Sequence, residues 1–129
     1  MRKVIEASVR DFKKSIEPLM PGDRMDKDSA KKLAEEIGEY LYNGVDGIKN
    51  EAGVEIYSGG SRYDRGKKRY MGAVSMKVRF DYDIADCVKY FNSYLQRKYR
   101  AKISDVEETR ASNTFFKYVS LYVYVPFIK

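Results

Sequence analysis

A ten-residue stretch in the middle of the chain alternates strictly between apolar and polar side chains. In residues 73–82, "AVSMKVRFDY", every second residue is apolar or aromatic and those between are polar or charged. A period of two over this length predicts a strand with one buried face. The face expected to be buried carries Val74, Met76, Val78, Phe80 and Tyr82.

Regular elements are also predicted on both sides of this strand. An amphipathic helix is expected over residues 84–100, with Asp83 as its N-cap, and strands follow over 102–109 and 115–125. A short strand is expected over 53–58. The intervening residues 59–72 hold glycines 59, 60, 66 and 72 and five basic side chains, so they predict a mobile, solvated hairpin arm.

The first third of the chain predicts two helices. An apolar stripe recurs at helical spacing over residues 3–16, and Pro18, Pro21 and Gly22 end it. A second helix is expected to begin near residues 26–29 and to stop at Gly44 and Gly47. The order is therefore α, α, β, β, α, β, β, an α+β fold with a mainly antiparallel sheet. We expect one domain over residues 1–129, with the helical segment 1–48 packed on residues 53–129; the strand order is left open.

Several classes of chemistry lack their usual residues. The chain has no histidine and one cysteine, so we expect no metal, no cofactor and no imidazole-based catalysis. Cys87 lies on the apolar face of its predicted helix and is interpreted as a buried structural thiol. Asp81, Asp83 and Asp86 offer carboxylates to a divalent cation, but helix capping by Asp83 and a favourable helix dipole at Asp86 are the preferred interpretation. No spacing pairs a nucleophile with a base, so no catalytic residue is predicted and the chain is expected not to be an enzyme.

The net charge of +6 comes entirely from residues 51–129. Two basic clusters dominate, the first over residues 62–69 and the second over residues 97–102. Each suggests an acidic partner, either nucleic acid or a carboxylate-rich protein face. The candidate binding residues are Arg62, Arg65, Lys67, Lys68, Arg69, Arg97, Lys98, Arg100 and Lys102. For the second cluster, stabilisation by the C-terminal helix dipole is an equally good explanation. Tyr63 and Tyr70 flank the arm over 62–69, where they either stack on bases or pack across the strand pair.

The last strand predicts a contact with another subunit. Its apolar face holds Val119, Leu121, Val123 and Val125, and its other face holds Tyr118, Tyr122 and Tyr124. Such a strand either lies centrally between helices or is half-exposed at an interface. Tyrosine is common at interfaces, and this chain has twelve tyrosines and no tryptophan. The three tyrosines are therefore candidate interface residues.

The order of elements over residues 73–125 resembles that of phage tail terminator, or tail-completion, proteins. The matching segments are the alternating strand "AVSMKVRFDY", the amphipathic helix "DIADCVKYFNSYLQRKY" and the last strand "FFKYVSLYVYV". The resemblance implies a ring of subunits, commonly a hexamer, that meet through strand edges and tyrosine faces. It implies no catalytic residues, and it places the basic arm against a DNA channel or an acidic neighbouring ring.

Two functions are carried forward from the sequence. The first is a non-enzymatic structural protein, such as a ring subunit of a viral tail or connector, which associates with itself or with a protein partner. The alternative is a small basic module that binds nucleic acid or an acidic protein, such as an anti-defence protein of a mobile element.

No apolar run reaches the roughly 20 residues of a membrane span, so we expect no membrane contact and a location in the host cytoplasm or the virion.

Overall fold

The computed structural model describes residues 25–110 and 115–127. Within them the fold is α+β: helix α1 (Lys27–Gly44) precedes the order β-β-α-β-β, and a four-stranded antiparallel sheet forms. The expected α+β class is thus confirmed. The helix predicted over residues 3–16 lies outside the described residues.

Local signals mark the start of helix α1 and the end of the helical segment that follows it. Asp26 is its N-cap, and a side-chain oxygen of Asp26 accepts a hydrogen bond of 2.8 Å from the backbone N–H of Ser29. The 3₁₀-helix η1 (Val45–Gly47) and the short helix α2 (Lys49–Ala52) follow. Gly53 ends α2 with a φ of 68°, a left-handed conformation that glycine adopts without strain. The chain then turns into the sheet.

The sheet has the order β1-β2-β4-β3, and every neighbouring pair is antiparallel. Its strands are β1 (Ile56–Asp64), β2 (Arg69–Arg79), β3 (Asp105–Arg110) and β4 (Phe116–Pro126). Gly60 of β1 lies opposite Ala73 of β2, and Ala73 lies opposite Tyr122 of β4. Asp105 of β3 also pairs with Tyr122, so one row of residues crosses all four strands.

The prediction for residues 53–72 was wrong in its boundaries and character. The strand begins at Ile56 and continues to Asp64, and β2 begins at Arg69, so most of the supposed mobile arm is paired strand. Two of the glycines that suggested mobility lie close against α1: a Cβ on Gly59 would lie 2.7 Å from the backbone oxygen of Gly38, and one on Gly72 would lie 2.7 Å from Cγ2 of Ile37. Only the turn between Asp64 and Arg69 projects without a strand partner.

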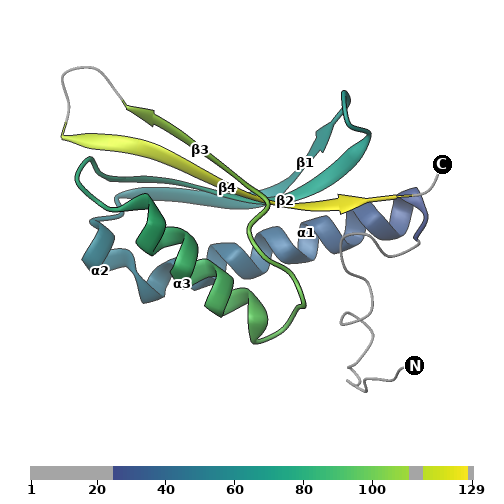
Figure 1. Ribbon diagram of the computed structural model, residues 1–129, viewed down its shortest axis with the longest axis horizontal. Coiled ribbons are helices and arrows are strands. Elements are labelled where there is room, and N and C mark those ends of the chain that lie inside the picture. The colour runs from purple at the N-terminus through teal and green to yellow at the C-terminus, as the bar shows by residue number, and fades with distance from the viewer. Residues whose placement is uncertain (1–24, 111–114, 128–129) are drawn as a thin grey trace.

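Helices α1 and α3 (Ile84–Gln96) cover one face of the sheet, and no helix of the described residues lies on the other, which we call the helix-free face (Figure 1). Asp83 is the N-cap of α3, as predicted, and accepts a hydrogen bond of 2.9 Å from the backbone N–H of Ala85.

The alternation of buried and exposed faces predicted for β2 and β4 is also found. The fully buried residues of these two strands are Val74, Val78, Val119, Leu121, Val123 and Val125. Phe80 departs from the pattern, because it follows the end of β2 and is 40% exposed.

No helix among the described residues is both long enough and apolar enough to cross a membrane.

Candidate interaction surface

The helix-free face of the sheet brings together two of the predicted binding residues, Arg62 and Arg69, and the three candidate interface tyrosines. The ends of the β1–β2 and β3–β4 hairpins rise at opposite ends of the sheet, on the side away from α1 and α3 (Figure 1). Alternation along each strand decides which side chains point to this face. They include Ser58, Arg62, Asp64, Arg69, Ser75, Tyr118, Tyr122, Tyr124, Asp105 and Glu107.

A first chain of polar contacts crosses this face from β1 to β3. The guanidinium of Arg62 donates a hydrogen bond of 3.3 Å to the hydroxyl of Tyr122, and that hydroxyl donates to a carboxylate oxygen of Glu107. The pKa of Tyr122 is raised, mainly because burial disfavours the phenolate and also because of its hydrogen bond to Glu107. Tyr122 therefore stays neutral and links a cation to a carboxylate across β4.

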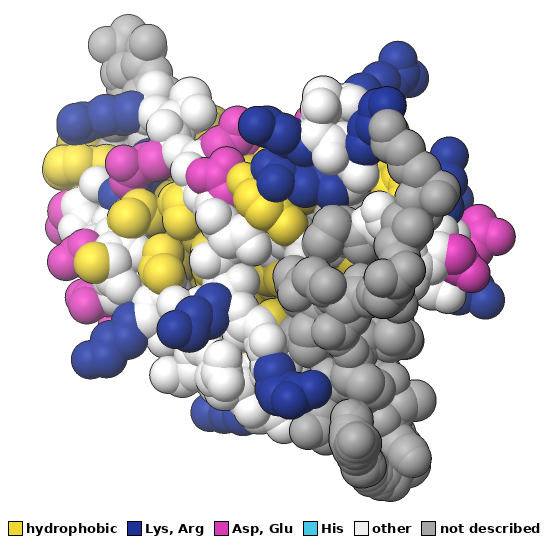
Figure 2. All heavy atoms as spheres, turned by 45° about the vertical axis from the view of Figure 1, so that its right-hand side comes forward, with side chains coloured by type: hydrophobic (Ala, Val, Ile, Leu, Met, Phe, Trp, Pro, Cys, Tyr) yellow, Lys and Arg dark blue, Asp and Glu magenta, His cyan; other side chains and the backbone are white. Residues whose placement is uncertain are grey.

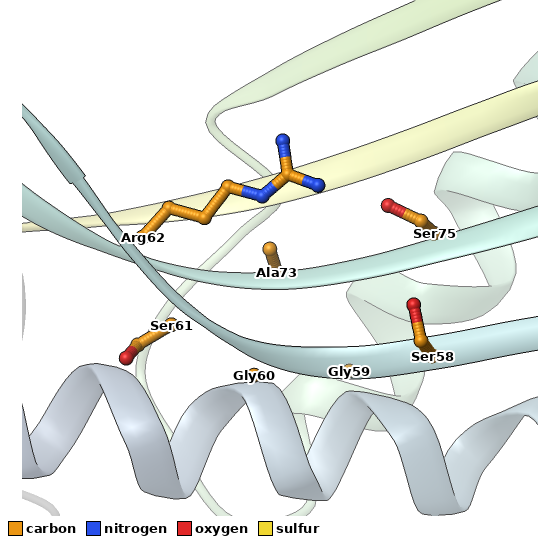
Figure 3. A pocket seen from close by; sticks show the side chains of 7 residues that line it. All are labelled: Ser58, Gly59, Gly60, Ser61, Arg62, Ala73 and Ser75. Atoms are coloured by element: carbon orange, nitrogen blue, oxygen red, sulfur yellow. The ribbon is translucent and has the colours of Figure 1, made fainter.

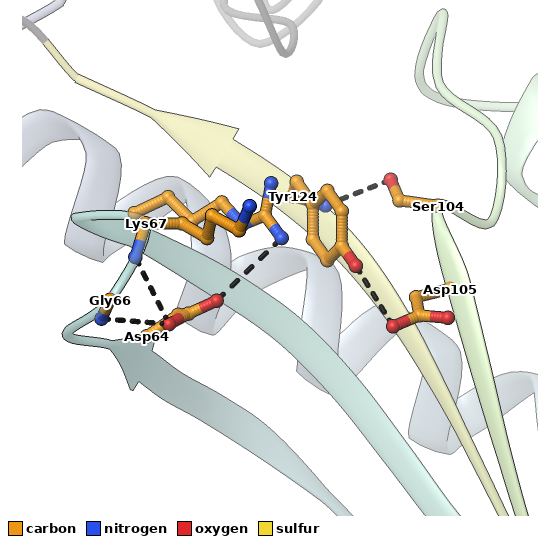
Figure 4. Close-up of polar contacts among 7 residues, drawn as sticks. Asp64, Gly66, Lys67, Ser104, Asp105 and Tyr124 are labelled. Atoms are coloured by element: carbon orange, nitrogen blue, oxygen red, sulfur yellow. Dashed lines mark hydrogen bonds and ion pairs between the residues drawn. The ribbon is translucent and has the colours of Figure 1, made fainter.

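A second chain of polar contacts crosses the same face, and the register places it nearer the β1–β2 turn. Figure 4 shows its residues Asp64, Tyr124 and Asp105. Arg69 forms an ion pair of 3.6 Å with Asp64, and its guanidinium carbon lies 3.4 Å from the centre of the Tyr124 ring. The hydroxyl of Tyr124 donates a hydrogen bond of 3.0 Å to Asp105. Both chains thus run from an arginine of β1 or β2, through a tyrosine of β4, to a carboxylate of β3.

The turn that joins β1 to β2 carries three more cations. An oxygen of Asp64 accepts hydrogen bonds from the backbone N–H groups of Gly66 and Lys67, at 3.0 Å and 3.2 Å (Figure 4). This carboxylate therefore holds the turn together and is not available to pair with every cation around it. Arg65, Lys67 and Lys68 are exposed, and no ion pair joins their side chains to another described residue.

A hollow of about 160 Å³ lies on the helix-free face, over β1 and β2. Arg62, Ser58 and Ser75 point into it, away from helix α1, while Gly60 and Ala73 form its floor (Figure 3). The hollow exists because its floor residues have little or no side chain: a Cβ on Gly60 would meet nothing within 4 Å. A second hollow of about 390 Å³ shares Arg62 and extends over Tyr122 and Tyr124. Neither hollow could be predicted from the sequence, because each depends on the register of the strands.

The second basic cluster lies in the helix layer, apart from the β1–β2 hairpin. Arg97 follows the end of α3 and its guanidinium lies 5.5 Å from the centre of the Tyr94 ring. The ammonium of Lys98 lies 5.5 Å from the ring centre of Tyr40 and 5.6 Å from that of Tyr99. These two cations cover tyrosines at the contact between α1 and α3, and the structure does not bring them to the helix-free face. Arg100 and Lys102 follow in the connection to β3.

The three predicted interface tyrosines share the helix-free face but differ in exposure. Tyr118 is 49% exposed and Tyr122 only 5%, because Tyr122 packs between Arg62 and Glu107. Across Lys77 from Tyr118 lies Ile56, which is 66% exposed. The signal that sequence reasoning missed is the alternation of Asp105 and Glu107 in β3, which predicts two carboxylates on one face of the strand.

Groups considered for catalysis or metal binding have structural partners. Cys87 is fully buried, and burial raises the pKa of its thiol to about 12, so it is a poor nucleophile. Asp81 forms an ion pair of 3.5 Å with Arg79, and Asp83 caps α3. The buried ammonium of Lys117 contacts Glu108 and the backbone oxygen of Tyr82, both at 2.6 Å.

Together these features define an α+β protein with one helix-covered face and one open, charged face on its sheet. Comparison of the chain with protein-family models, with curated proteins and with solved structures finds no match.

Proposed function

We propose that this chain is a non-enzymatic structural protein that assembles with further copies of itself, as the ring subunits of viral tails and connectors do. The observation that carries the proposal is the relation between the two edge strands. Each neighbouring pair in the order β1-β2-β4-β3 is antiparallel, so β1 and β3 run in opposite directions. A second copy placed beside the first by a simple rotation can therefore add its β1 to β3 and continue an antiparallel sheet.

The side chains at the two edges favour this pairing over the pairing of like edges. Strand β3 carries the acidic residues Asp105, Glu107 and Glu108, so two β3 edges repel each other. Strand β1 carries Arg62, and near its start the exposed Ile56. A long edge strand with an exposed apolar residue and no proline is a ready site for pairing with another chain. A head-to-tail contact of this kind closes into a ring when the rotation between copies allows it.

The test is the absolute mass in solution, measured by light scattering after size exclusion at low and at high salt. We expect a multiple of the 15.0 kDa chain mass for the wild type. Ile56→Lys should shift the mass towards that of one chain, because it places a charge at the exposed start of β1. Asn43→Lys is the matched control, since it adds the same charge to an exposed site on α1 and should leave the mass unchanged.

Circular dichroism of both variants checks that each is folded. A wild-type chain that stays at the mass of one subunit at both salt concentrations and at high protein concentration would overturn the proposal. Equal loss of assembly in Ile56→Lys and Asn43→Lys would show that added charge alone, and not the β1 edge, decides the mass.

A further inference from the structure

The free end of the β1–β2 hairpin is strongly basic. Residues 62–69 hold five cations and one carboxylate. Figure 2 shows dark-blue side chains at the upper right, where this hairpin comes forward. We propose that this hairpin binds double-stranded nucleic acid through the phosphate backbone, independently of base sequence and of whether the chain assembles.

The three cations of the turn are free to meet a ligand. Arg65, Lys67 and Lys68 are exposed and form no ion pair with another described residue, so their mutual repulsion is not relieved within that part of the chain. No helix dipole stabilises them either, because the turn joins two strands. A row of phosphates supplies the missing negative charge, and contact with it releases condensed counterions.

The rest of the hairpin is held in one arrangement before any ligand arrives. Asp64 is bonded to two backbone N–H groups of the turn and to Arg69. Arg69 lies against the Tyr124 ring, and Arg62 donates to Tyr122. The arginines therefore lose little side-chain freedom on binding. Fixed cations beside a firm turn are suited to positions as regular as those of backbone phosphates.

The aromatic side chains of the hairpin favour a duplex over a single strand. Binding of single strands relies on exposed rings on which bases stack. Here the ring centres of Tyr63 and Tyr70 lie 4.8 Å apart, and that of Tyr70 lies 5.8 Å from Phe127. Lys27 lies 5.9 Å from the Tyr63 ring centre. These rings pack on one another on the helix side of the sheet. Tyr63 is 40% exposed, but it lies on the opposite face from Arg62 and Arg69, so a base stacked on it would be away from those arginines.

The shape of the hairpin fits the same ligand. The major groove of duplex DNA is about 12 Å wide and admits a two-stranded β-ribbon. A ribbon laid along this groove sets the three turn cations, with Arg62 and Arg69 behind them, beside the phosphates that line the edges of the groove. An acidic protein surface offers neither a groove nor regularly spaced charges, so a duplex matches the hairpin better.

Fluorescence anisotropy with a labelled duplex DNA, titrated at several salt concentrations, tests the proposal. We expect saturable binding that weakens steeply with salt. The variant Arg65→Gln, Lys67→Gln, Lys68→Gln should weaken binding at least about tenfold and lower the slope of log affinity against log salt by about 2 to 3. The matched control is Lys31→Gln, Lys32→Gln, Lys89→Gln, which removes the same charge from exposed helical sites and should change affinity less than about twofold.

A gain of binding separates the hairpin contact from misfolding. Asp64→Asn keeps an oxygen that accepts the two N–H groups of the turn but removes the one carboxylate among the cations. It should therefore bind the duplex more tightly than the wild type. The proposal is overturned if the turn variant and its control lose equal amounts of duplex affinity, or if Asp64→Asn binds the duplex more weakly than the wild type. It is also overturned if the protein prefers a single strand of equal length, or if it binds polyglutamate but not the duplex.

Discussion

The guanidinium carbon of Arg69 lies 3.4 Å from the centre of the Tyr124 ring, a contact that joins β2 to β4 at the base of the projecting hairpin. The two residues lie 55 positions apart in the chain, and they are not directly opposite in the register, where Arg69 pairs with Pro126 and Tyr124 with Met71. A diagonal contact of this kind is within reach of long side chains. It adds a side-chain contact to the paired backbones of β2 and β4 at the point where the turn begins.

Removing this arginine should destabilise the protein. Arg69→Ala loses both the ring contact and the ion pair with Asp64, so we expect the free energy of unfolding to fall by about 1 kcal/mol in urea titrations. Arg65→Ala is the control, because this neighbouring arginine is exposed in the turn and its loss should leave stability nearly unchanged. Equal effects of the two variants would contradict the structural role of the Arg69–Tyr124 contact.

A glycine in α1 should resist the substitution that normally stabilises helices. Alanine is favoured over glycine in a helix interior by about 1 kcal/mol, yet a Cβ on Gly38 would overlap the backbone carbonyl of Gly60 in β1. Gly38→Ala should therefore lower the free energy of unfolding by about 2 kcal/mol, because the helix must move away from the strand.

The matched control for Gly38→Ala is Gly60→Ala, on the other side of the same contact. A Cβ on Gly60 points to the open face and meets nothing within 4 Å. The free energy of unfolding of Gly60→Ala, measured by the same urea titration, should equal or slightly exceed that of the wild type. A stabilised Gly38→Ala would show that α1 does not approach β1 as closely as described.

The turn of the hairpin contains a strained residue. Lys68 has a φ of 52°, in the left-handed region that non-glycine residues enter at a cost of about 1 kcal/mol or more. Lys68→Gly should relieve this strain and raise the thermal midpoint by a few degrees. Lys67→Gly removes the same charge where φ is not positive, so the thermal midpoint should stay the same or fall. A rise of similar size in both variants would instead indicate relief of charge repulsion.

Stability should decline as the solution becomes alkaline. Burial raises the pKa of the Cys87 thiol from 9.0 to about 12, so the unfolded chain releases this proton at lower pH than the folded chain. The stabilisation is present in full below about pH 9 and is lost as the pH rises towards 12. Burial also raises the pKa of Tyr82 and of Tyr99, which act in the same direction.

Urea midpoints at about pH 8 and about pH 11 measure this decline. Cys87→Ala should show a smaller difference between the two midpoints than the wild type, although the tyrosines still contribute. An identical difference in both proteins would mean that the thiol does not couple to folding.

Local periodicity explains what could be predicted from the sequence. The buried faces of β2 and β4, the helix capped by Asp83 and the α+β order all depend on spacing within short segments. The hairpin was misjudged for a related reason. The glycines of this segment and the charged turn lack an apolar period, and only contact with α1 shows why Gly59 and Gly72 are small.

The sequence by itself therefore determined which residues turn inward, because alternation and helical spacing are properties of neighbouring residues. The tertiary structure alone decided which residues meet. The order β1-β2-β4-β3 and its register bring Arg62 to Tyr122 and Tyr122 to Glu107, and set Arg97 and Lys98 against tyrosines in the helix layer. Strand pairing joins segments far apart in the chain, and a shift of one residue would send every side chain of a strand to the other face.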